Sequence, residues 1–155
     1  EEVWEVLGGR DDCSVFIEEW YGLPDAQLDG EAIAAWLKIG AWRARVNKRL
    51  EESRAAGQIG SALAAEIDIY ADGADYDVLA RLGDDLRFVM ITSRAGVQRV
   101  GTEAEQRIEV LVSAHAKCER CWHYREDIGR DAAHPTLCAR CASNLAGDNE
   151  GRRYA

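Results

Sequence analysis

The chain has 155 residues, of which 47% are hydrophobic and 30% charged, and its formal net charge is −9. This composition is typical of one globular domain with room for a small appendage, and it excludes a disordered segment. No apolar run approaches the roughly 18 residues that a membrane-spanning helix needs, and the start, "EEVWEVLGGR", lacks the basic residues and apolar core of a signal peptide. Since the sequence also has no initiator Met, we expect a cytoplasmic fragment of a longer protein.

The negative charge is concentrated at the start of the chain. Residues 1–35 hold ten acidic residues and one basic residue, whereas residues 36–155 hold 18 of each. An acidic total usually argues against nucleic-acid binding. Here it requires only that any nucleic-acid surface be local and lie after residue 35.

The first segment, residues 1–29, has too little pattern to fold by itself. We expect an incomplete element followed by a loop that ends at Pro24. Cys13 stands apart from the other cysteines, and we interpret it as a buried or incidental thiol.

The next segment predicts a long amphipathic helix, with Asp29 as its N-cap and its end near Gly57 or Gly60. Apolar residues recur at near-helical spacing, at Ile33, Trp36, Leu37, Ile39, Val46 and Leu50. The same helix carries the basic residues Lys38, Arg43, Arg45, Lys48, Arg49 and Arg54. These residues form either an ordinary solvated face or a surface that contacts phosphates.

A small sheet is predicted from the residues that follow. "LAAEIDIY" alternates as a half-buried strand, "ADGAD" is typical of a turn, and "GVQRV" and "RIEVLVSAH" are further strands. A second helix between the strands carries Leu79, Leu82, Leu86 and Val89. One face of the last strand carries Ile108, Val110, Val112 and Ala114. We therefore expect an α+β fold, a small antiparallel or mixed sheet with helices on one face, followed by a four-cysteine zinc-ribbon or knuckle module.

Four of the five cysteines form two C-x2-C pairs with sixteen residues between them, namely Cys118, Cys121, Cys138 and Cys141. Zinc prefers four such ligands in a tetrahedron, and four cysteines leave no open position for a catalytic water. Two disulfides, a redox pair and a rubredoxin-like iron site are the alternatives. The spacing and the expected reducing compartment favour one structural zinc ion.

The cysteine module, residues 117–155, has few large apolar side chains, so metal binding must supply much of its folding free energy. We expect His115, His123 and His134 to lie around the site or on the surface and not to bind the metal. Arg120 and Trp122 flank Cys121 in the sequence. An exposed indole could stack on an unpaired base while the guanidinium reaches a phosphate or a base edge. Alternatively, Trp122 is the core of the knuckle.

At this point the residues resemble a known family. "KCERCWHY", followed by "LCARCASNLAGDNEGRRYA", resembles the C-terminal zinc module of bacterial-type isoleucyl-tRNA synthetases, and the likeness extends upstream through "VNKRLEESRAAGQIGSALAAEIDIY". The resemblance implies three domains: the end of a helical anticodon-binding domain at 1–29, a small α/β junction domain at 30–116 and a zinc-binding module at 117–155. DNA glycosylases of the formamidopyrimidine type share the cysteine spacing but not the order of the pieces.

The resemblance also implies a function. The parent enzyme, a monomeric class I synthetase, would attach isoleucine to its tRNA with ATP, whereas this fragment would hold no catalytic residue. Its partner would be tRNA of the isoleucine type, with no DNA and no membrane. The RNA contacts would come from Arg120 and Trp122, with Lys117 and Arg125 beside them. A protein-interaction zinc ribbon and the zinc finger of a DNA glycosylase-like protein are the alternatives.

Overall fold

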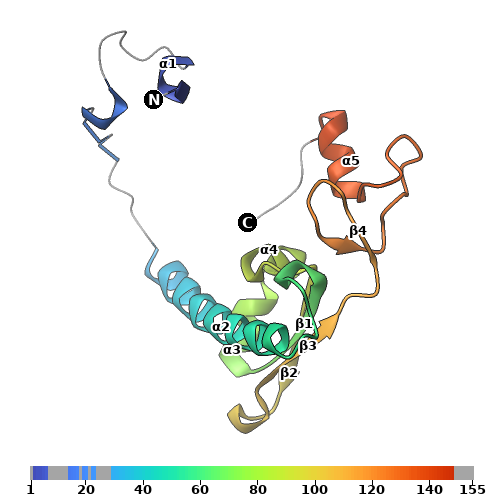
Figure 1. Ribbon diagram of the computed structural model, residues 1–155. Helices are drawn as coiled ribbons and strands as arrows, with labels where there is room; N and C mark the ends of the chain where they lie inside the picture. Colours follow the sequence, from blue (N-terminus) through green and yellow to red (C-terminus); the bar gives the residue numbers. More distant parts are fainter. Residues whose placement is uncertain (1, 7–13, 18, 21, 24–28, 149–155) are drawn as a thin grey trace.

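The computed structural model describes residues 2–6, 14–17, 19–20, 22–23 and 29–148. Two short elements precede Asp29, the helix α1 (Glu2–Val6) and the 3-10 turn η1 (Val15–Ile17). Cys13 and Pro24, on which two of the expectations fall, lie outside the described residues. The remaining elements form a helix-and-sheet unit and, after it, the cysteine module (Figure 1).

The longest element is α2 (Gly30–Ala55), which confirms the predicted helix. Asp29 caps its first turn, because a side-chain oxygen of Asp29 accepts a hydrogen bond from the backbone N–H of Glu31 at 3.0 Å. Gly57, just past the helix, has a positive φ of 70° that few residues other than glycine adopt. The helix therefore begins at the predicted cap and ends two residues before the nearer of the two predicted glycines.

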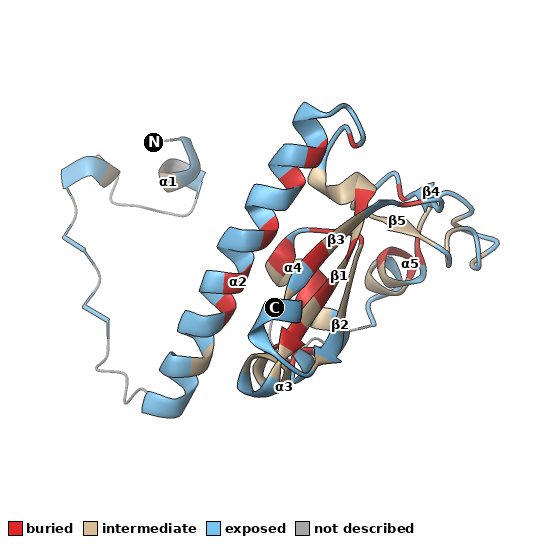
Figure 2. Cartoon of the chain, turned by 90° about the horizontal axis from the view of Figure 1, so that it is seen from below, coloured by how far each residue is buried: buried red, intermediate tan, exposed pale blue. Residues whose placement is uncertain are grey.

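The buried stripe of α2 differs in part from the predicted one. Its buried apolar side chains are Ile39, Trp42, Val46 and Leu50. The residues at the start of the predicted stripe, Ile33, Trp36 and Leu37, are exposed. Ile33 and Leu37 lie on the side of the helix opposite the buried stripe, and Figure 2 shows the first turns of α2 exposed and the buried residues on its later turns. Trp42, which is only 2% exposed, anchors the helix instead.

A three-stranded mixed sheet forms the centre of the unit. Its strands are β1 (Ala65–Asp72), β2 (Arg94–Val100) and β3 (Arg107–Val112), in the order β2-β1-β3. β1 pairs in parallel with β2, with Ile67 opposite Ala95, and antiparallel with β3, with Ile67 opposite Val110. The parallel pair needs a helical crossover, which the segment between β1 and β2 supplies.

That crossover is a broken helix and not the continuous one that the leucine spacing predicts. It consists of α3 (Gly73–Ala80), the 3-10 turn η3 (Gly83–Asp85) and α4 (Leu86–Met90). Gly83 has a φ of 53°, and this left-handed backbone conformation interrupts the α-helical path. The "ADGAD" stretch is likewise not a separate turn, because β1 runs to Asp72 and α3 begins at Gly73.

The sheet has one apolar face and one polar face. Ala65, Ile67, Ile69 and Ala71 of β1 are fully buried and belong to one core cluster with α2, α3 and α4. Each of these helices packs against the sheet, and α2 also packs against α3 and α4. The helices therefore cover one face, as predicted. On the edge strand β3 burial decreases from Ile108 to the exposed Val112, and Ala114 lies beyond the strand.

The other face of β1 presents Glu66, Asp68 and Tyr70, which pair across the strands. Arg94 of β2 donates to Glu66 at 2.8 Å and to both carboxylate oxygens of Asp68 at 2.8 and 2.9 Å. The opposite charges on neighbouring strands stabilise the register of the sheet. Gly96 leaves room for this pair, because a Cβ atom there would lie 2.5 Å from an Asp68 oxygen.

The cysteine module follows β3. It contains a two-stranded antiparallel hairpin, β4 (Ala116–Lys117) and β5 (Tyr124–Arg125), and the helix α5 (Ala139–Ala146). Two further 3-10 turns, η2 (Ala62–Ala64) and η4 (Glu103–Glu105), lie next to strands of the main sheet. Among the described helices, none has the length and apolar character needed to cross a membrane.

Candidate metal centre

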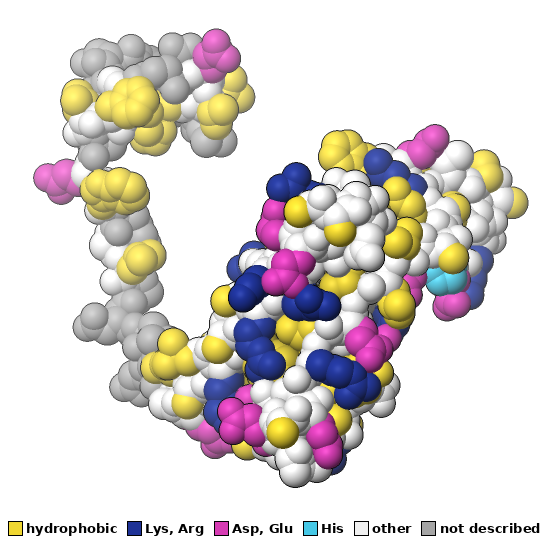
Figure 3. Space-filling view, turned by 60° about the horizontal axis from the view of Figure 1, so that its bottom comes forward, with side chains coloured by type: hydrophobic (Ala, Val, Ile, Leu, Met, Phe, Trp, Pro, Cys, Tyr) yellow, Lys and Arg dark blue, Asp and Glu magenta, His cyan; other side chains and the backbone are white. Residues whose placement is uncertain are grey.

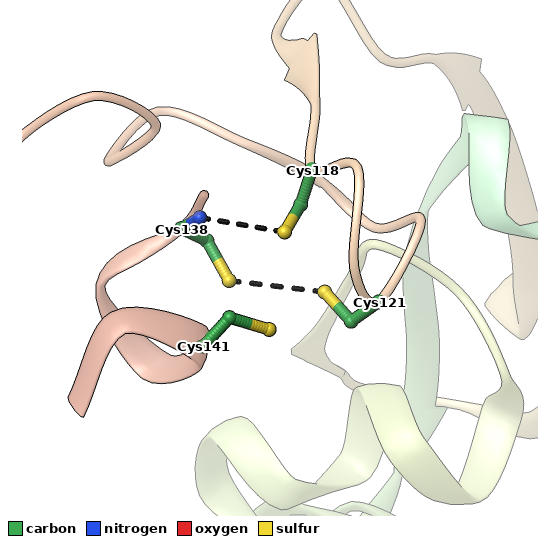
Figure 4. A group of neighbouring side chains, drawn as sticks. All are labelled: Cys118, Cys121, Cys138 and Cys141. Atoms are coloured by element: carbon green, nitrogen blue, oxygen red, sulfur yellow. Dashed lines mark hydrogen bonds between the residues drawn. The ribbon is translucent and has the colours of Figure 1, made fainter. Parts of the chain in front are cut away.

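The structure brings the four predicted cysteines together. The Sγ atoms of Cys118, Cys121, Cys138 and Cys141 all lie within 4.8 Å of one another. Figure 4 shows the four sulfurs converging from two segments, the turn of the β4–β5 hairpin and the start of α5. No other group of this kind occurs in the described part of the chain, and no histidine belongs to it. That the three histidines are not ligands stays a prediction, with which this grouping agrees.

The local backbone explains how each pair of thiols is aimed. In the hairpin turn, Trp122 donates its N–H to the carbonyl of Cys118 at 2.9 Å, and Cys118 donates to His123 at 2.9 Å. This tight turn directs Cys118 and Cys121 to one side. Cys138 is the N-cap of α5, and Cys141 lies one turn into the helix. The positive end of the helix dipole therefore faces the thiols and favours their ionised form.

The thiols of Cys118 and Cys138 differ in acidity. Burial opposes ionisation of Cys118, but hydrogen bonds from backbone N–H groups, including that of Cys138 at 3.4 Å, outweigh it and lower the pKa of the Cys118 thiol to about 6. Burial, with the added charge of the neighbouring Cys121, raises the pKa of Cys138 to about 12. A cation at the centre would offset the repulsion and allow all four to ionise.

The donor set fits zinc. Tetrahedral Zn–S bonds of about 2.3 Å place the sulfurs about 3.8 Å apart, and the Cys121 and Cys138 sulfurs are 3.7 Å apart. All four cysteines are free thiols, which argues against the two-disulfide alternative. Three of them are buried and Cys121 is half-buried, so the site is closed. Such a site holds a metal for structure and leaves no position for substrate or water.

Trp122 is not the core of the knuckle. Its side chain is 59% exposed, and its backbone has a φ of 66°, in the left-handed region that bulky residues rarely adopt. Lys117 lies over the indole with its Nζ 4.9 Å from the ring centroid. The structure thus presents an aromatic face with a cation beside it at the tip of the cysteine turn.

The other two candidate RNA contacts have different surroundings. Arg120 is exposed, and its Nη1 lies 3.8 Å from the sulfur of Cys141, where it offsets part of the burial that raises the pKa of that thiol. Arg125 is half-buried, and its guanidinium donates to the carbonyl of Ser93 at 3.4 Å. Arg125 thus contributes to the junction with the sheet, whereas Lys117, Arg120 and Trp122 are open to solvent.

The junction between the module and the sheet unit depends on residues that the sequence did not identify. The buried Ser93 hydroxyl accepts a hydrogen bond from the N–H of Tyr124 at 2.6 Å and donates to the carbonyl of Leu63 at 2.5 Å. Phe88 of α4 meets the ring of His123 edge-on at 5.7 Å, and Arg140 of α5 lies over the same phenyl ring. A serine after a helix carries no sequence signal that could have indicated this role.

Comparison with known proteins adds two findings. Residues 117–144 match a family described as the zinc finger found in FPG and IleRS. The whole chain is 49% identical to an isoleucine–tRNA ligase of Aromatoleum aromaticum, of which it covers 16%. It is 50% identical over its whole length to the corresponding ligases of Nitrosomonas europaea and Bordetella parapertussis, of which it covers 17% in each case.

The two findings differ in whether they separate the ligase interpretation from the glycosylase interpretation. The zinc-finger family includes both FPG and IleRS, so residues 117–144 alone do not separate the ligase interpretation from the glycosylase one. The matches to the ligases do separate these two interpretations, because they cover the whole of this chain, including the sheet unit and the first residue. The chain spans about one sixth of these relatives. The cluster of four cysteines and the family match together support one structural zinc ion. Over its entire length the chain is therefore homologous to a segment of the isoleucine–tRNA ligases, with their type of zinc finger at residues 117–144.

Proposed function

We propose that this chain is the C-terminal, tRNA-recognising region of an isoleucine–tRNA ligase, and that its cysteine module contacts the anticodon end of the tRNA. The complete protein would bind isoleucine and ATP elsewhere and attach the amino acid to tRNA of the isoleucine type. It would act in the cytoplasm as a monomer, with RNA and not DNA as its partner. The homology to isoleucine–tRNA ligases over the whole chain supports this assignment.

The observation that carries the proposal is the exposed indole of Trp122. A large aromatic side chain is normally buried, and residues other than glycine or asparagine rarely adopt a φ of 66°. Trp122 is nevertheless exposed and has this φ. Strained backbone at the tip of a rigid turn is characteristic of functional positions. The unpaired bases of a tRNA loop are suitable partners, because each offers a flat face on which an indole stacks.

In this proposal each residue has a separate role. Trp122 stacks on a base, Lys117 and Arg120 attract the phosphates around it, and Arg125 keeps the hairpin in place against Ser93. A zinc ion bound by the four thiolates holds the two segments of the module together. The module recognises and positions the RNA, and the chemistry of aminoacylation takes place in other parts of the complete protein.

The test is Trp122→Ala in the complete protein. A stacked base contributes about 1–3 kcal/mol, so we expect kcat/KM for cognate tRNA to fall by about fivefold to a hundredfold. The rate of isoleucine activation, measured by ATP–pyrophosphate exchange without tRNA, should stay the same, as should the zinc content. Unchanged kinetics for tRNA would instead favour a protein-interaction module.

A further inference from the structure

A second positively charged feature lies in the sheet unit and shares no residue with the cysteine cluster. A surface hollow of about 410 Å³ opens between α2 and β3, and we call it the α2–β3 hollow. It is lined by Arg45, Lys48, Arg49, Glu52, Arg107 and Ile108. Figure 3 shows Lys and Arg side chains along the helix, with acidic side chains between them.

Helical spacing explains why the basic residues converge. Lys48 and Arg49 follow Arg45 by three and four residues, which places them on one face of α2 with it. Arg107 approaches from the start of β3. The hollow thus has four basic side chains and one acidic side chain, in a chain whose formal net charge is −9.

Two of these cations, Arg45 and Lys48, form no direct ion pair with a carboxylate in the described part of the chain. The guanidinium of Arg45 donates to the amide oxygen of Gln106 at 2.9 Å and lies 3.8 Å from the centroid of the Trp42 ring. Trp42 is itself held, since its indole N–H donates to Asp75 at 3.0 Å. Neutral groups therefore make the direct contacts that orient Arg45, and the carboxylate of Asp75 senses its charge without pairing with it, which is a preorganised arrangement for an anion. Within the described part of the chain, Lys48 has no hydrogen bond or ion pair.

The other two cations are paired with acidic residues. Arg49 lies 2.5 Å from a carboxylate oxygen of Glu52, and Arg107 lies 2.9 Å from one of Glu109. Both pairs are exposed, so water screens them and the arginines keep donors for another partner. The local surface remains positive even after these two carboxylates are counted.

We propose that the α2–β3 hollow binds a phosphate of an RNA backbone. All four basic side chains are exposed, and the lining has none of the enclosed backbone N–H cradle that holds a free phosphate or nucleotide. An open site made of side chains is suited to a strand that passes across it. This inference rests on the proposed tRNA role. It gives the sheet unit an RNA contact of its own, which does not depend on the identity of the base.

The experiment compares Lys48→Gln with Arg43→Gln in the complete protein, using filter binding of cognate and non-cognate tRNA at several salt concentrations. Arg43 is on the same helix, exposed and without a charged partner in the described residues, but it is outside the hollow. We expect Lys48→Gln to weaken both tRNAs equally, by about threefold to tenfold, and to reduce the slope of log K against log salt by about one. Lys48→Arg should restore binding.

The outcomes separate this inference from the proposed function. Equal losses in Lys48→Gln and Arg43→Gln would show a general charge effect and overturn the site, as would no loss in Lys48→Gln. Saturable binding of inorganic phosphate that Lys48→Gln abolishes, with tRNA affinity unchanged, would assign the hollow to a free anion and also overturn it. If Trp122→Ala has no effect while Lys48→Gln weakens tRNA binding, the anticodon proposal fails and the hollow stands.

Discussion

At the scale of single residues, backbone strain and side-chain exposure together mark Trp122. The cysteine turn needs one residue with a positive φ directly after Cys121, and glycine would satisfy this at no steric cost. Tryptophan there disfavours the turn and adds little to the packing, since more than half of its side chain is in solvent. Neither backbone preference nor packing accounts for the tryptophan, and the proposed base contact would account for it.

This argument predicts a difference between two substitutions of Trp122. Both Trp122→Gly and Trp122→Ala should weaken tRNA charging, but glycine also relieves the strained φ and should stabilise the module by about 1 kcal/mol relative to alanine. Because folding of the module is coupled to metal binding, competition with a chelator measures the difference. We expect the glycine variant to hold zinc about fivefold more tightly than the alanine variant. The reverse order would show that the φ of Trp122 imposes no strain.

At the scale of elements, the pairing of Arg94 with Glu66 and Asp68 shows how the polar face of the sheet is held. Arg94 lowers the pKa of Asp68 through its hydrogen bonds. Burial raises the pKa of Glu66, but hydrogen bonds from Arg94 and Ser113 outweigh it and lower that pKa as well. A carboxylate whose folded pKa lies below the unfolded value stabilises the fold above the unfolded pKa of about 4. That contribution is lost as the pH falls through the folded pKa.

Asp68→Asn should therefore destabilise the chain at pH 7 by about 1–2 kcal/mol, after allowance for the partial exposure of Arg94. The gap between the variant and the wild type should narrow as the pH is lowered below about 4, because only the wild type loses the ionised pair there. Urea unfolding at pH 7 and pH 3 measures it. Asp77→Asn, which breaks the exposed pair with Arg99, is the matched control and should cost less than about 0.5 kcal/mol. A constant gap across this pH range would refute the assignment.

Local patterns predicted most of these elements, and the errors have specific physical causes. Periodicity identified α2 and the three strands, because the covered face of each is apolar. It could not show that the crossover is broken, since the spacing of Leu79, Leu82 and Leu86 fits a continuous helix equally well. The left-handed φ of Gly83 becomes visible only in the structure. Whether Trp36 or Trp42 enters the core depends on which side of the helix faces the sheet, and the helix sequence alone does not decide this.

Of the candidate sites, the sequence predicted the cysteine cluster but neither the junction nor the hollow. The four cysteines were identified as candidate ligands from their spacing alone, because two C-x2-C pairs separated by a short stretch of chain are typical of a zinc site. The junction could not be predicted, since Ser93 and Tyr124 are 31 residues apart and carry no motif. The same holds for the hollow, where Arg107 joins the α2 face only once β3 has packed beside the helix.

At the scale of the whole molecule, the sheet unit and the cysteine module have different sources of stability. The sheet unit buries a core of fourteen residues, including Ile67, Leu79 and Met90, whereas the module's buried cluster consists of Cys118, Cys138 and Cys141. Aliphatic burial sustains the first unit without a ligand. We expect the second to need a metal ion to bring its segments together.

Removal of a metal ligand should therefore unfold the cysteine module and leave the sheet unit folded. In Cys138→Ser, we expect amides of residues 117–148 to lose protection from hydrogen exchange while amides of β1 and β3 keep theirs. Cys13→Ser, a change in the cysteine outside the two pairs, should preserve both. Simultaneous loss of protection in the sheet and the module would contradict the division into two units.

Ser93 has a consequence for the way recognition of the RNA can be altered. One small hydroxyl group, bonded on one side to Leu63 in η2 and on the other to Tyr124 of the hairpin, helps to fix the orientation of the hairpin relative to the sheet. A change at this pivot would turn the indole of Trp122 away from the base on which we propose that it stacks, while all four sulfurs kept their positions within the module. If the proposed contact holds, tRNA recognition depends on a residue that is not itself among the proposed contacts.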